Sequence, residues 1–341
     1  MKHVIAATAA LVLATSATAQ DGPAPSPHEI VAGAPQSEWV AIQREDLLVM
    51  TLAPDRDGNV RRVVIQLMPA PFSQGWVKNI RTLARAQWYD GTSINRVQDN
   101  YVVQWGDVDG EDAAKAKPLP EGLQVMGEDE YARSDAVKFF DVVWGQLGWR
   151  SSSEIVQSIR TQLGPRADFD DAYSATVGFH SGFPFGQSSE IRHQSDAMYI
   201  RTADAWPVHC YGMVGVGRSY SPDTGSGAEL YTVIGHAPRH LDRNTALVGR
   251  VIEGIEHLSS LPRGTGELGF YESADERVTI ESIRMGTEAE VAPFEYLDTE
   301  SATFARYAEA RANRRDPFFI VPAGGADICN IPVPVRRVAA Q

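Results

Sequence analysis

The sequence has few of the residues and motifs that mark metal, phosphate or nucleophile chemistry. Its 341 residues include two cysteines, and its eight histidines are scattered without the spacing of zinc ligands. No G-x-S-x-G motif is present, which argues against a hydrolase of that type. The Gly-rich stretch 212–217 is followed by neither a predicted helix start nor a lysine, so it does not predict a phosphate site. We expect no metal and no cofactor.

The sequence is also poor in positive charge and in long apolar runs. It has 31 Lys and Arg against 44 Asp and Glu, a formal net charge of −13. Phosphate binding depends on clustered Lys and Arg, so we expect no nucleic-acid partner. The apolar run 4–14 is shorter than the roughly 20 residues that span a bilayer, and no later run is longer. We therefore expect no membrane span.

The N-terminus has the features of a secretory signal peptide. Lys2 precedes the apolar run, and small residues ending at Ala17-Thr18-Ala19 form an A-x-A site. We expect a signal peptide over 1–19, cleavage near Ala19, and a periplasmic or secreted protein.

Cys210 and Cys329 can form one disulfide in an exported chain. Such a bridge would tie the C-terminal tail to the middle of the chain. The other interpretation is two unpaired thiols.

Strand-like patterns dominate the chain. Residues 47–52 and 60–68 flank a D-G turn and predict a hairpin. A helix is predicted over 73–84, where the apolar residues share one face. Further strands are predicted at 94–97, 101–105, 210–216, 229–234, 246–251 and 277–284, a short helix near 252–258 and another helix over 299–315. Short helices among many short strands fit a β-barrel with helical caps, although periodicity alone does not distinguish a barrel from a sandwich.

The chain divides by composition into five segments. After the signal peptide, 20–37 is rich in Pro, Gly and Ala and is interpreted as a linker. The main domain is expected over 38–290, with an insertion at about 108–205 and a C-terminal extension over 291–341. Within the insertion, helices are predicted from Ser134 and over 151–163, and 169–200 is predicted to be loop.

Two blocks carry the most specific signal. The first is Tyr89-Asp-Gly-Thr-Ser-Ile-Asn-Arg96-Val, followed after a short bend by Tyr101-Val-Val-Gln104-Trp-Gly-Asp107. The second runs from Met213 through Glu229-Leu-Tyr231 and His240-Leu241-Asp242 to Gly249-Arg-Val251. In order and spacing these blocks resemble the cyclophilin family of peptidyl-prolyl cis-trans isomerases over roughly 40–107 and 205–285. The resemblance implies a mainly β fold: a closed, antiparallel, eight-stranded barrel with two capping helices, here enlarged by a helical insertion and the extension.

The resemblance also implies the site residues. Arg96 matches the catalytic arginine and Gln104 the glutamine on the facing strand. The matching substrate-binding positions are Tyr101, Val102, Val214, Gly215, Val216, Glu229, Tyr231 and Leu241. Departures from the family pattern are Asn95 in place of His, Glu229 in place of a pocket Gln, and Thr245 in place of the His that often closes the proline pocket.

This residue set suits rotation about an amide bond. Rotation needs no nucleophile or metal, only a site that binds the twisted amide better than the planar one. The function expected is isomerisation of X–Pro bonds in proline-containing exported polypeptides. The alternatives are a catalytically weak peptide-binding or chaperone module on the same fold, and a structural partner in an envelope assembly.

Overall fold

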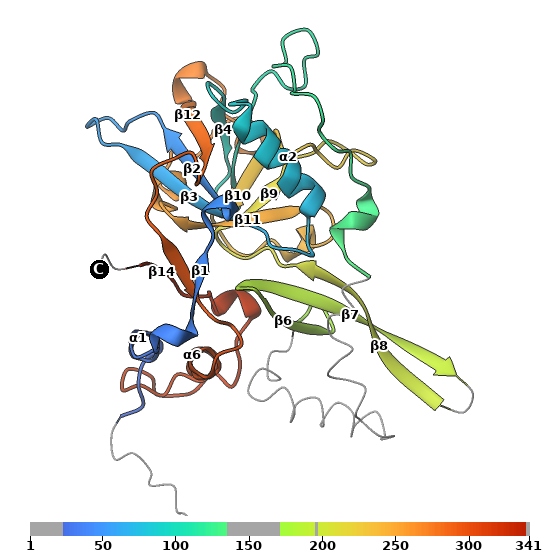
Figure 1. Cartoon of the computed structure of the whole chain (residues 1–341), viewed down its shortest axis with the longest axis vertical. Coiled ribbons are helices and arrows are strands. Elements are labelled where there is room, and N and C mark those ends of the chain that lie inside the picture. Colours follow the sequence, from blue (N-terminus) through green and yellow to red (C-terminus); the bar gives the residue numbers. More distant parts are fainter. Residues whose placement is uncertain (1–22, 135–170, 195–196, 339–341) are drawn as a thin grey trace, which may run out of the picture.

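The computed structural model describes residues 23–134, 171–194 and 197–338. These residues form a closed eight-stranded β-barrel and two separate three-stranded sheets (Figure 1). The predicted signal peptide, 1–19, lies outside the described residues. In the described part of the chain, no helix has the length and apolar character needed to cross a bilayer.

The barrel confirms the predicted fold class. Its strands pair antiparallel in the order β10-β5-β4-β12-β2-β3-β11-β9, and β9 pairs with β10 to close the ring. Closure leaves no unpaired strand edge. The barrel strands are β2 (Leu47–Leu52), β3 (Arg61–Leu67), β4 (Ser93–Val97), β5 (Val102–Gly106), β9 (Met213–Val216), β10 (Leu230–Val233), β11 (Leu247–Glu253) and β12 (Val278–Met285).

Two helices pack against the barrel. Helix α2 (Gln74–Arg85) places Trp76, Ile80 and Leu83, spaced as one helical face, in the barrel core. Burying each such side chain contributes about 1.5–3 kcal/mol. The indole N–H of Trp76 donates to the carbonyls of Thr224 and Gly225, which attaches the helix to the loop before β10. Helix α5 (Glu256–Ser259) follows β11. Short 3-10 turns occupy Gln36–Glu38, Arg44–Asp46, Glu128–Tyr131, Arg239–Leu241, Glu267–Gly269, Ala274–Glu276 and Ile328–Asn330.

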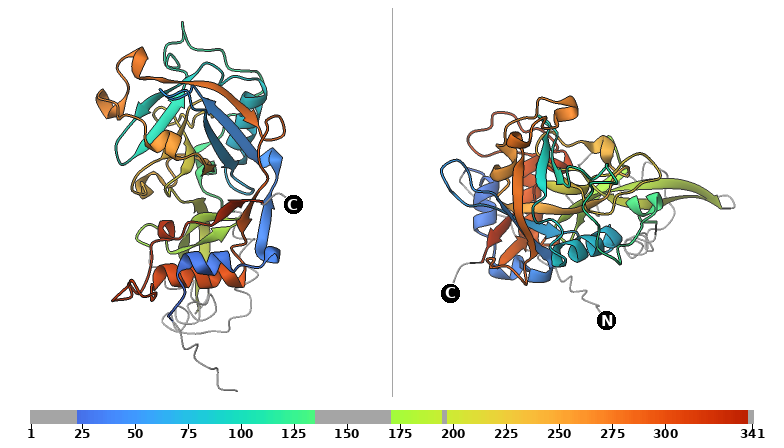
Figure 2. Two further views of the ribbon diagram at one scale, coloured as in Figure 1. Left: turned by 90° about the vertical axis from the view of Figure 1, so that its left-hand side faces the viewer. Right: turned by 90° about the horizontal axis from the view of Figure 1, so that it is seen from above.

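The C-terminal extension forms a second sheet with the first residues of the predicted main domain. Strand β1 (Trp39–Ile42) pairs with β13 (Phe294–Leu297), which pairs with β14 (Val335–Arg337). Helices α1 (Pro27–Ala32) and α6 (Ala302–Ala312) lie side by side next to this sheet (Figure 2). The prediction of a linker is wrong for the residues of α1, because the apolar side chains on this helix find a partner in α6.

The insertion contains a sheet that the sequence did not predict. Strands β6 (Thr176–His180), β7 (Phe183–Gln194) and β8 (Ala197–Pro207) form an antiparallel meander. The loop predicted over 169–200 is therefore wrong, because strands β6, β7 and the start of β8 occupy most of its described residues. The helices predicted from Ser134 and over 151–163 lie almost entirely outside the described residues.

The disulfide between Cys210 and Cys329 is present, which confirms the pairing. Their Cα atoms are 5.0 Å apart. The bridge joins the segment that follows β8 to the 3-10 turn before β14. It therefore attaches the C-terminal extension to the chain just before barrel strand β9.

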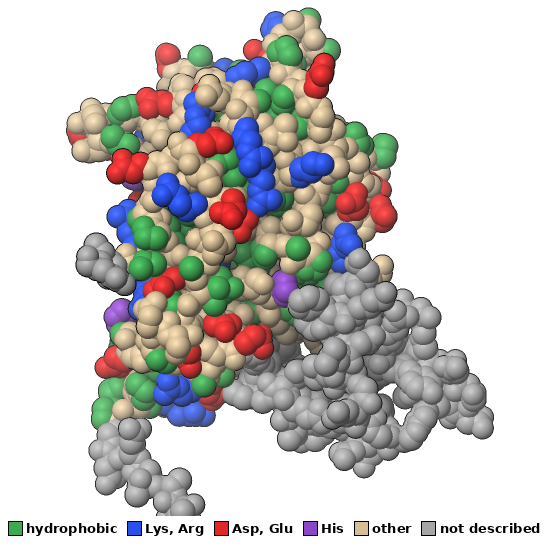
Figure 3. Space-filling model, in the orientation of Figure 1, with side chains coloured by type: hydrophobic (Ala, Val, Ile, Leu, Met, Phe, Trp, Pro, Cys, Tyr) green, Lys and Arg blue, Asp and Glu red, His purple; other side chains and the backbone are tan. Residues whose placement is uncertain are grey.

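Acidic and basic side chains are interspersed on the face of the barrel seen in Figure 3. This face therefore presents charges of both signs. Elsewhere in the barrel such charges pair directly: Arg284 on β12 donates twice to the carboxylate of Asp90, at 2.7 and 2.6 Å.

Candidate active site

The β4–β5 hairpin brings Arg96 and Gln104 together. They are direct partners in the antiparallel register, so their side chains leave the same face of the sheet. A register shift between Ile94 and Arg96 marks a bulge at Asn95. Bulges re-aim the side chains beside them, and here the bulge directly precedes the predicted catalytic arginine.

Three acceptors hold the guanidinium of Arg96. Its Nε–H donates to the carbonyl of Leu268 at 2.8 Å, and Nη1 donates to Oε1 of Gln104 at 3.0 Å. Nη2 donates to Oε1 of Gln98. A guanidinium has five N–H groups, so two take part in no hydrogen bond within the described part of the chain. Arg96 is thereby fixed in direction while keeping donors for a ligand.

Aromatic rings flank the same guanidinium. The ring centroids of Tyr101 and Phe270 lie 5.7 and 5.4 Å from its central carbon. Burial lowers the pKa of Arg96, and Tyr101 and Glu229 oppose this shift. Arginine remains charged in proteins, so the site contains a fixed cation in a partly dry environment.

Gln104 links this cation to a carboxylate. Its amide nitrogen donates to Oε2 of Glu229 at 2.9 Å, while its oxygen accepts from Arg96. The cation at one end and the anion at the other therefore set the orientation of the amide. Burial raises the pKa of Glu229, and the nearby carboxylates of Glu111 and Asp107 raise it further. The hydrogen bond from Gln104 and the charge of Arg96 act in the opposite direction.

A small apolar cluster lies beside the polar chain. Val102 and Tyr231 are buried in it, and Tyr101 and Leu241 pack against it. The register explains this grouping, because Tyr231 on β10 pairs with Gln104 on β5. The cavity over these residues has a volume of about 770 Å³ and opens to the surface. Its lining contains most of the predicted site residues: Arg96, Tyr101, Val102, Gln104, Val216, Glu229, Tyr231 and Leu241.

Val214 and Gly215 do not line this cavity. The side chain of Val214 is buried in the barrel core. Gly215 lies against the back of Tyr231, where an added Cβ would approach the ring carbon Cζ to 2.3 Å. Gly215 therefore supports the pocket by leaving room for the tyrosine ring.

Sequence reasoning missed the loop that holds Arg96. Leu268 supplies the carbonyl acceptor and Phe270 supplies one flanking ring, and both line the cavity. Leu268 has a φ of 54°, an uncommon backbone conformation for a residue with a branched side chain. The stretch Gly264–Gly269 has no periodicity or motif that marks it as part of a site.

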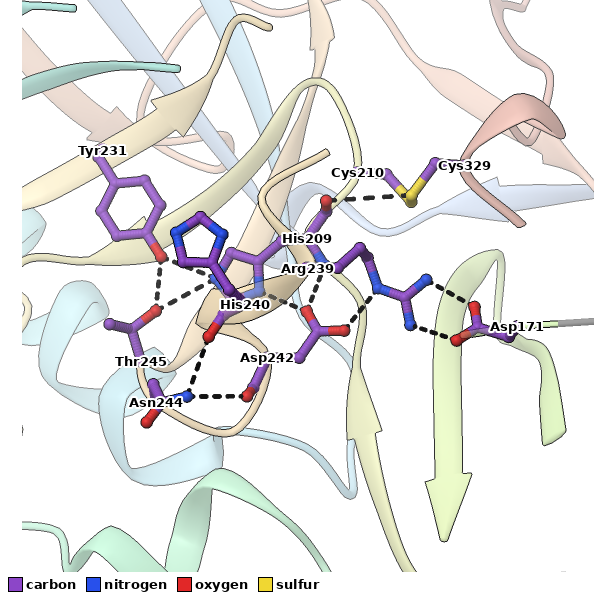
Figure 4. Close-up of polar contacts among 10 residues, drawn as sticks. All are labelled: Asp171, His209, Cys210, Tyr231, Arg239, His240, Asp242, Asn244, Thr245 and Cys329. Carbon is purple, nitrogen blue, oxygen red and sulfur yellow. Dashed lines mark hydrogen bonds and ion pairs between the residues drawn. A yellow bond between two sulfur atoms is a disulfide. The ribbon is translucent and has the colours of Figure 1, made fainter. Parts of the chain in front are cut away.

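The sequence also gave no sign of a buried polar network behind Tyr231 (Figure 4). The Tyr231 hydroxyl lies 2.8 Å from Nε2 of His209 and 2.6 Å from Oγ1 of Thr245. Nδ1 of His209 lies 2.8 Å from Oδ1 of Asp242. Arg239 donates to the other carboxylate oxygen of Asp242 at 2.6 Å.

The same arginine extends the network to the insertion. Arg239 donates twice to the carboxylate of Asp171, at 2.6 and 3.1 Å, and both side chains are almost fully buried. Within residues 23–134, 171–194 and 197–338, no group of three or more His, Cys, Asp or Glu side chains is placed to hold a metal ion.

A known protein family and one crystal structure agree with this architecture. The family described as "Cyclophilin type peptidyl-prolyl cis-trans isomerase/CLD" matches residues 59–285. The crystal structure of cyclophilin AquaCyp293 from Hirschia baltica is similar, with a TM-score of 0.60 and 20% sequence identity, over 89% of this chain and 95% of that one. A cyclophilin type peptidyl-prolyl cis-trans isomerase from Cryptosporidium parvum has 11% identity and a TM-score of 0.37, over 72% of this chain and 99% of that one. No curated protein matches the sequence.

Proposed function

Because the chain belongs to the cyclophilin-type peptidyl-prolyl cis-trans isomerase family, we propose that it isomerises X–Pro bonds in exported polypeptides and that Arg96 carries the catalysis. The observation that supports this most directly is the guanidinium of Arg96, which is fixed by three acceptors and retains two N–H groups at the cavity.

The chemistry needs such a group. Amide resonance gives a rotation barrier of about 18–20 kcal/mol, so uncatalysed X–Pro isomerisation takes tens to hundreds of seconds. In the twisted state the proline nitrogen becomes pyramidal and gains a lone pair. The remaining donors of Arg96 can bind that lone pair, which the planar ground state lacks. Binding that strengthens only in the twisted state lowers the barrier.

The apolar cluster is suited to hold the proline ring. Val102, Tyr231 and Leu241 offer carbon-rich surface beside Arg96, and Tyr101 lies between this surface and the cation. Gln104 is positioned to contact the peptide backbone. Because both ends of its amide are already occupied, a bound peptide must share or replace the bonds to Arg96 and Glu229.

Export is part of the proposal. The N-terminal pattern predicts a signal peptide, and the disulfide between Cys210 and Cys329 suits an oxidising compartment. The expected substrates are proline-containing chains in that compartment.

The test is the isomerisation rate on a panel of X–Pro tetrapeptides. Arg96→Ala removes the directed donors and should lower kcat by about 10²–10³, the cost of losing one oxyanion-type donor. Arg56→Ala is the matched control, since Arg56 is exposed in the β2–β3 turn, and it should leave the rate unchanged. Circular dichroism would check the fold of each variant. Equal rates for Arg96→Ala and the parent protein would refute the proposed role.

A second candidate function is peptide binding with little turnover. The observation that favours it is the occupied amide of Gln104, together with Glu229 where the family pattern has glutamine. A folded protein that binds prolyl peptides without accelerating their isomerisation would support this candidate. A stable partner protein, recovered without peptide binding at the cavity, would instead support a structural role in an envelope assembly.

A further inference from the structure

We propose that His209 is a positioning residue of the proline pocket: it holds the phenol of Tyr231 through its Nε2 atom and thereby sets the affinity for the proline ring. The kinetic test of this inference rests on the proposed function, because it needs isomerase activity. The residue lies within the matched range 59–285 but outside the two motif blocks, Tyr89–Asp107 and Met213–Val251. It follows β8 and directly precedes Cys210 of the disulfide.

Asp242 fixes the tautomer of His209. Its Oδ1 accepts from the backbone N–H of His209 at 3.0 Å and lies 2.8 Å from Nδ1. Its Oδ2 accepts from Arg239, so the carboxylate is ion-paired and can only accept. Nδ1 of His209 therefore carries the proton. The imidazole is 1% exposed, and burial lowers its pKa, against the opposing effect of Asp242. The neutral ring presents Nε2 as a bare acceptor.

Two hydroxyl groups share that acceptor. The oxygens of Tyr231 and Thr245 lie 2.8 and 3.1 Å from Nε2 and 2.6 Å from each other. One hydroxyl proton goes to Nε2, and the other lies between the two oxygens. In either arrangement both protons are used within the triad. Loss of Nε2 would leave a buried hydroxyl without its acceptor, which is costly.

The ring of Tyr231 is thus held on two sides. Gly215 lies so close to the ring that even a methyl side chain at this position would clash with it. The imidazole of His209 lies nearly parallel, at 12° and with a centroid distance of 6.2 Å. The same ring packs with Val102 and Leu241 in the apolar cluster of the cavity. Its position therefore determines the width of the space for proline.

A buried histidine with all its hydrogen bonds made can also be a purely structural residue. The positioning role and the structural role predict different kinetics. The proline ring contacts the pocket in both the planar and the twisted state. A change in pocket width therefore alters binding of both states alike, which raises KM and leaves kcat nearly unchanged. Arg96→Ala should show the reverse, since its donors act mainly in the twisted state. A purely structural role for His209 predicts lower stability with both kinetic constants retained per folded molecule.

The experiment compares His209→Phe, Tyr231→Phe and the double variant with the parent protein. Each single change removes one partner of a hydrogen bond worth about 1–1.5 kcal/mol, so each should raise KM about five- to tenfold with kcat retained. His209→Phe should add little to KM in the Tyr231→Phe background, because the bond through which His209 holds Tyr231 is already absent and Nε2 then serves only Thr245. His209→Gln, which keeps an acceptor, should restore part of the affinity. Additive effects, or an unchanged KM in either single variant, would overturn the proposal.

Two readouts separate failure of this inference from failure of the proposed function. The dissociation constant for an Ala-Pro tetrapeptide, measured by NMR titration, tests the pocket even when turnover is absent. Nitrogen-15 NMR of the parent protein, assigned by the resonance lost in His209→Gln, should show a proton on Nδ1 and none on Nε2. A proton on Nε2 would overturn the inference. Because this measurement uses the parent protein, it remains decisive even if His209→Phe does not fold.

Discussion

Removal of the disulfide should lower the free energy of unfolding by about 5 kcal/mol. The bridge closes a loop of 119 residues between Cys210 and Cys329. In the chain-entropy model, the cost of closing a loop of this length is about 5 kcal/mol at 25 °C. Without the bridge, the unfolded chain regains this entropy. We therefore expect the Cys210→Ala/Cys329→Ala double variant to be less stable by this amount.

Urea unfolding followed by tryptophan fluorescence measures the effect. With a denaturant slope of about 2–3 kcal/mol per molar, the loss corresponds to a fall in midpoint of roughly 2 M urea. Reductant should bring the parent protein to the midpoint of the double variant and leave the variant itself unchanged, because it has no cysteine left. Midpoints within about 0.3 M for the oxidised parent and the double variant would refute the entropic argument.

Three further predictions follow from buried groups. Burial raises the pKa of Glu229 above 4.5, so its contribution to stability is present below pH 4.5 and is lost as the pH rises through the raised pKa. Glu229→Gln should therefore stabilise the protein at pH 7 more than at pH 4 in urea titrations, and an equal gain at both would contradict this. Gly215→Ala would force its Cβ against Tyr231, so thermal unfolding should show a loss of about 1–3 kcal/mol, together with weaker peptide binding. Arg250 donates in a buried site to two acceptors: Oε1 of Gln66, from Nε and Nη2 at 3.0 and 2.8 Å, and the carbonyl of Gly182, from Nη1 at 2.7 Å. Arg250→Met should therefore cost about 1–3 kcal/mol for each of these acceptors left unpaired, and unchanged urea stability would show that they find other partners.

The barrel was predictable because its strands carry a strong local signal. The hairpin of β2 and β3 has dense apolar runs around a D-G turn, and helix α2 has a clean apolar face. The family resemblance then implied that Arg96 and Gln104 lie on facing strands. Their pairing in the register and the hydrogen bond between them agree with that expectation.

The meander in the insertion gave no such signal. Strand β6 alternates, but its five residues contain only two apolar side chains, Val177 and Phe179, with a glycine between them, which is too short and weak a pattern to predict a strand. Strand β7 begins Phe183-Pro184-Phe185-Gly186, which reads as a loop because Pro and Gly are rare in strand interiors. Strand β7 is stabilised by its pairing with β8. Such pairing depends on contacts between two segments, so neither sequence alone predicts it.

The network at His209 escaped prediction for a related reason. Asp171, His209, Tyr231 and Asp242 come from four separate segments, and each is an ordinary residue in its own stretch of sequence. Only the fold brings them into contact. Arg239, between two acidic partners, connects Asp171 of the insertion to Asp242 behind Tyr231.

The second sheet leaves its first strand without a partner during most of synthesis. Strand β1 (Trp39–Ile42) has its partner in β13, about 250 residues later in the chain. At roughly 5–20 residues per second, the first strand therefore waits on the order of ten seconds to a minute for its partner to be made. During that interval its backbone N–H and C=O groups are open to any other extended chain. A protein proposed to assist the folding of others is thus itself exposed to mispairing until nearly all of its own chain has emerged.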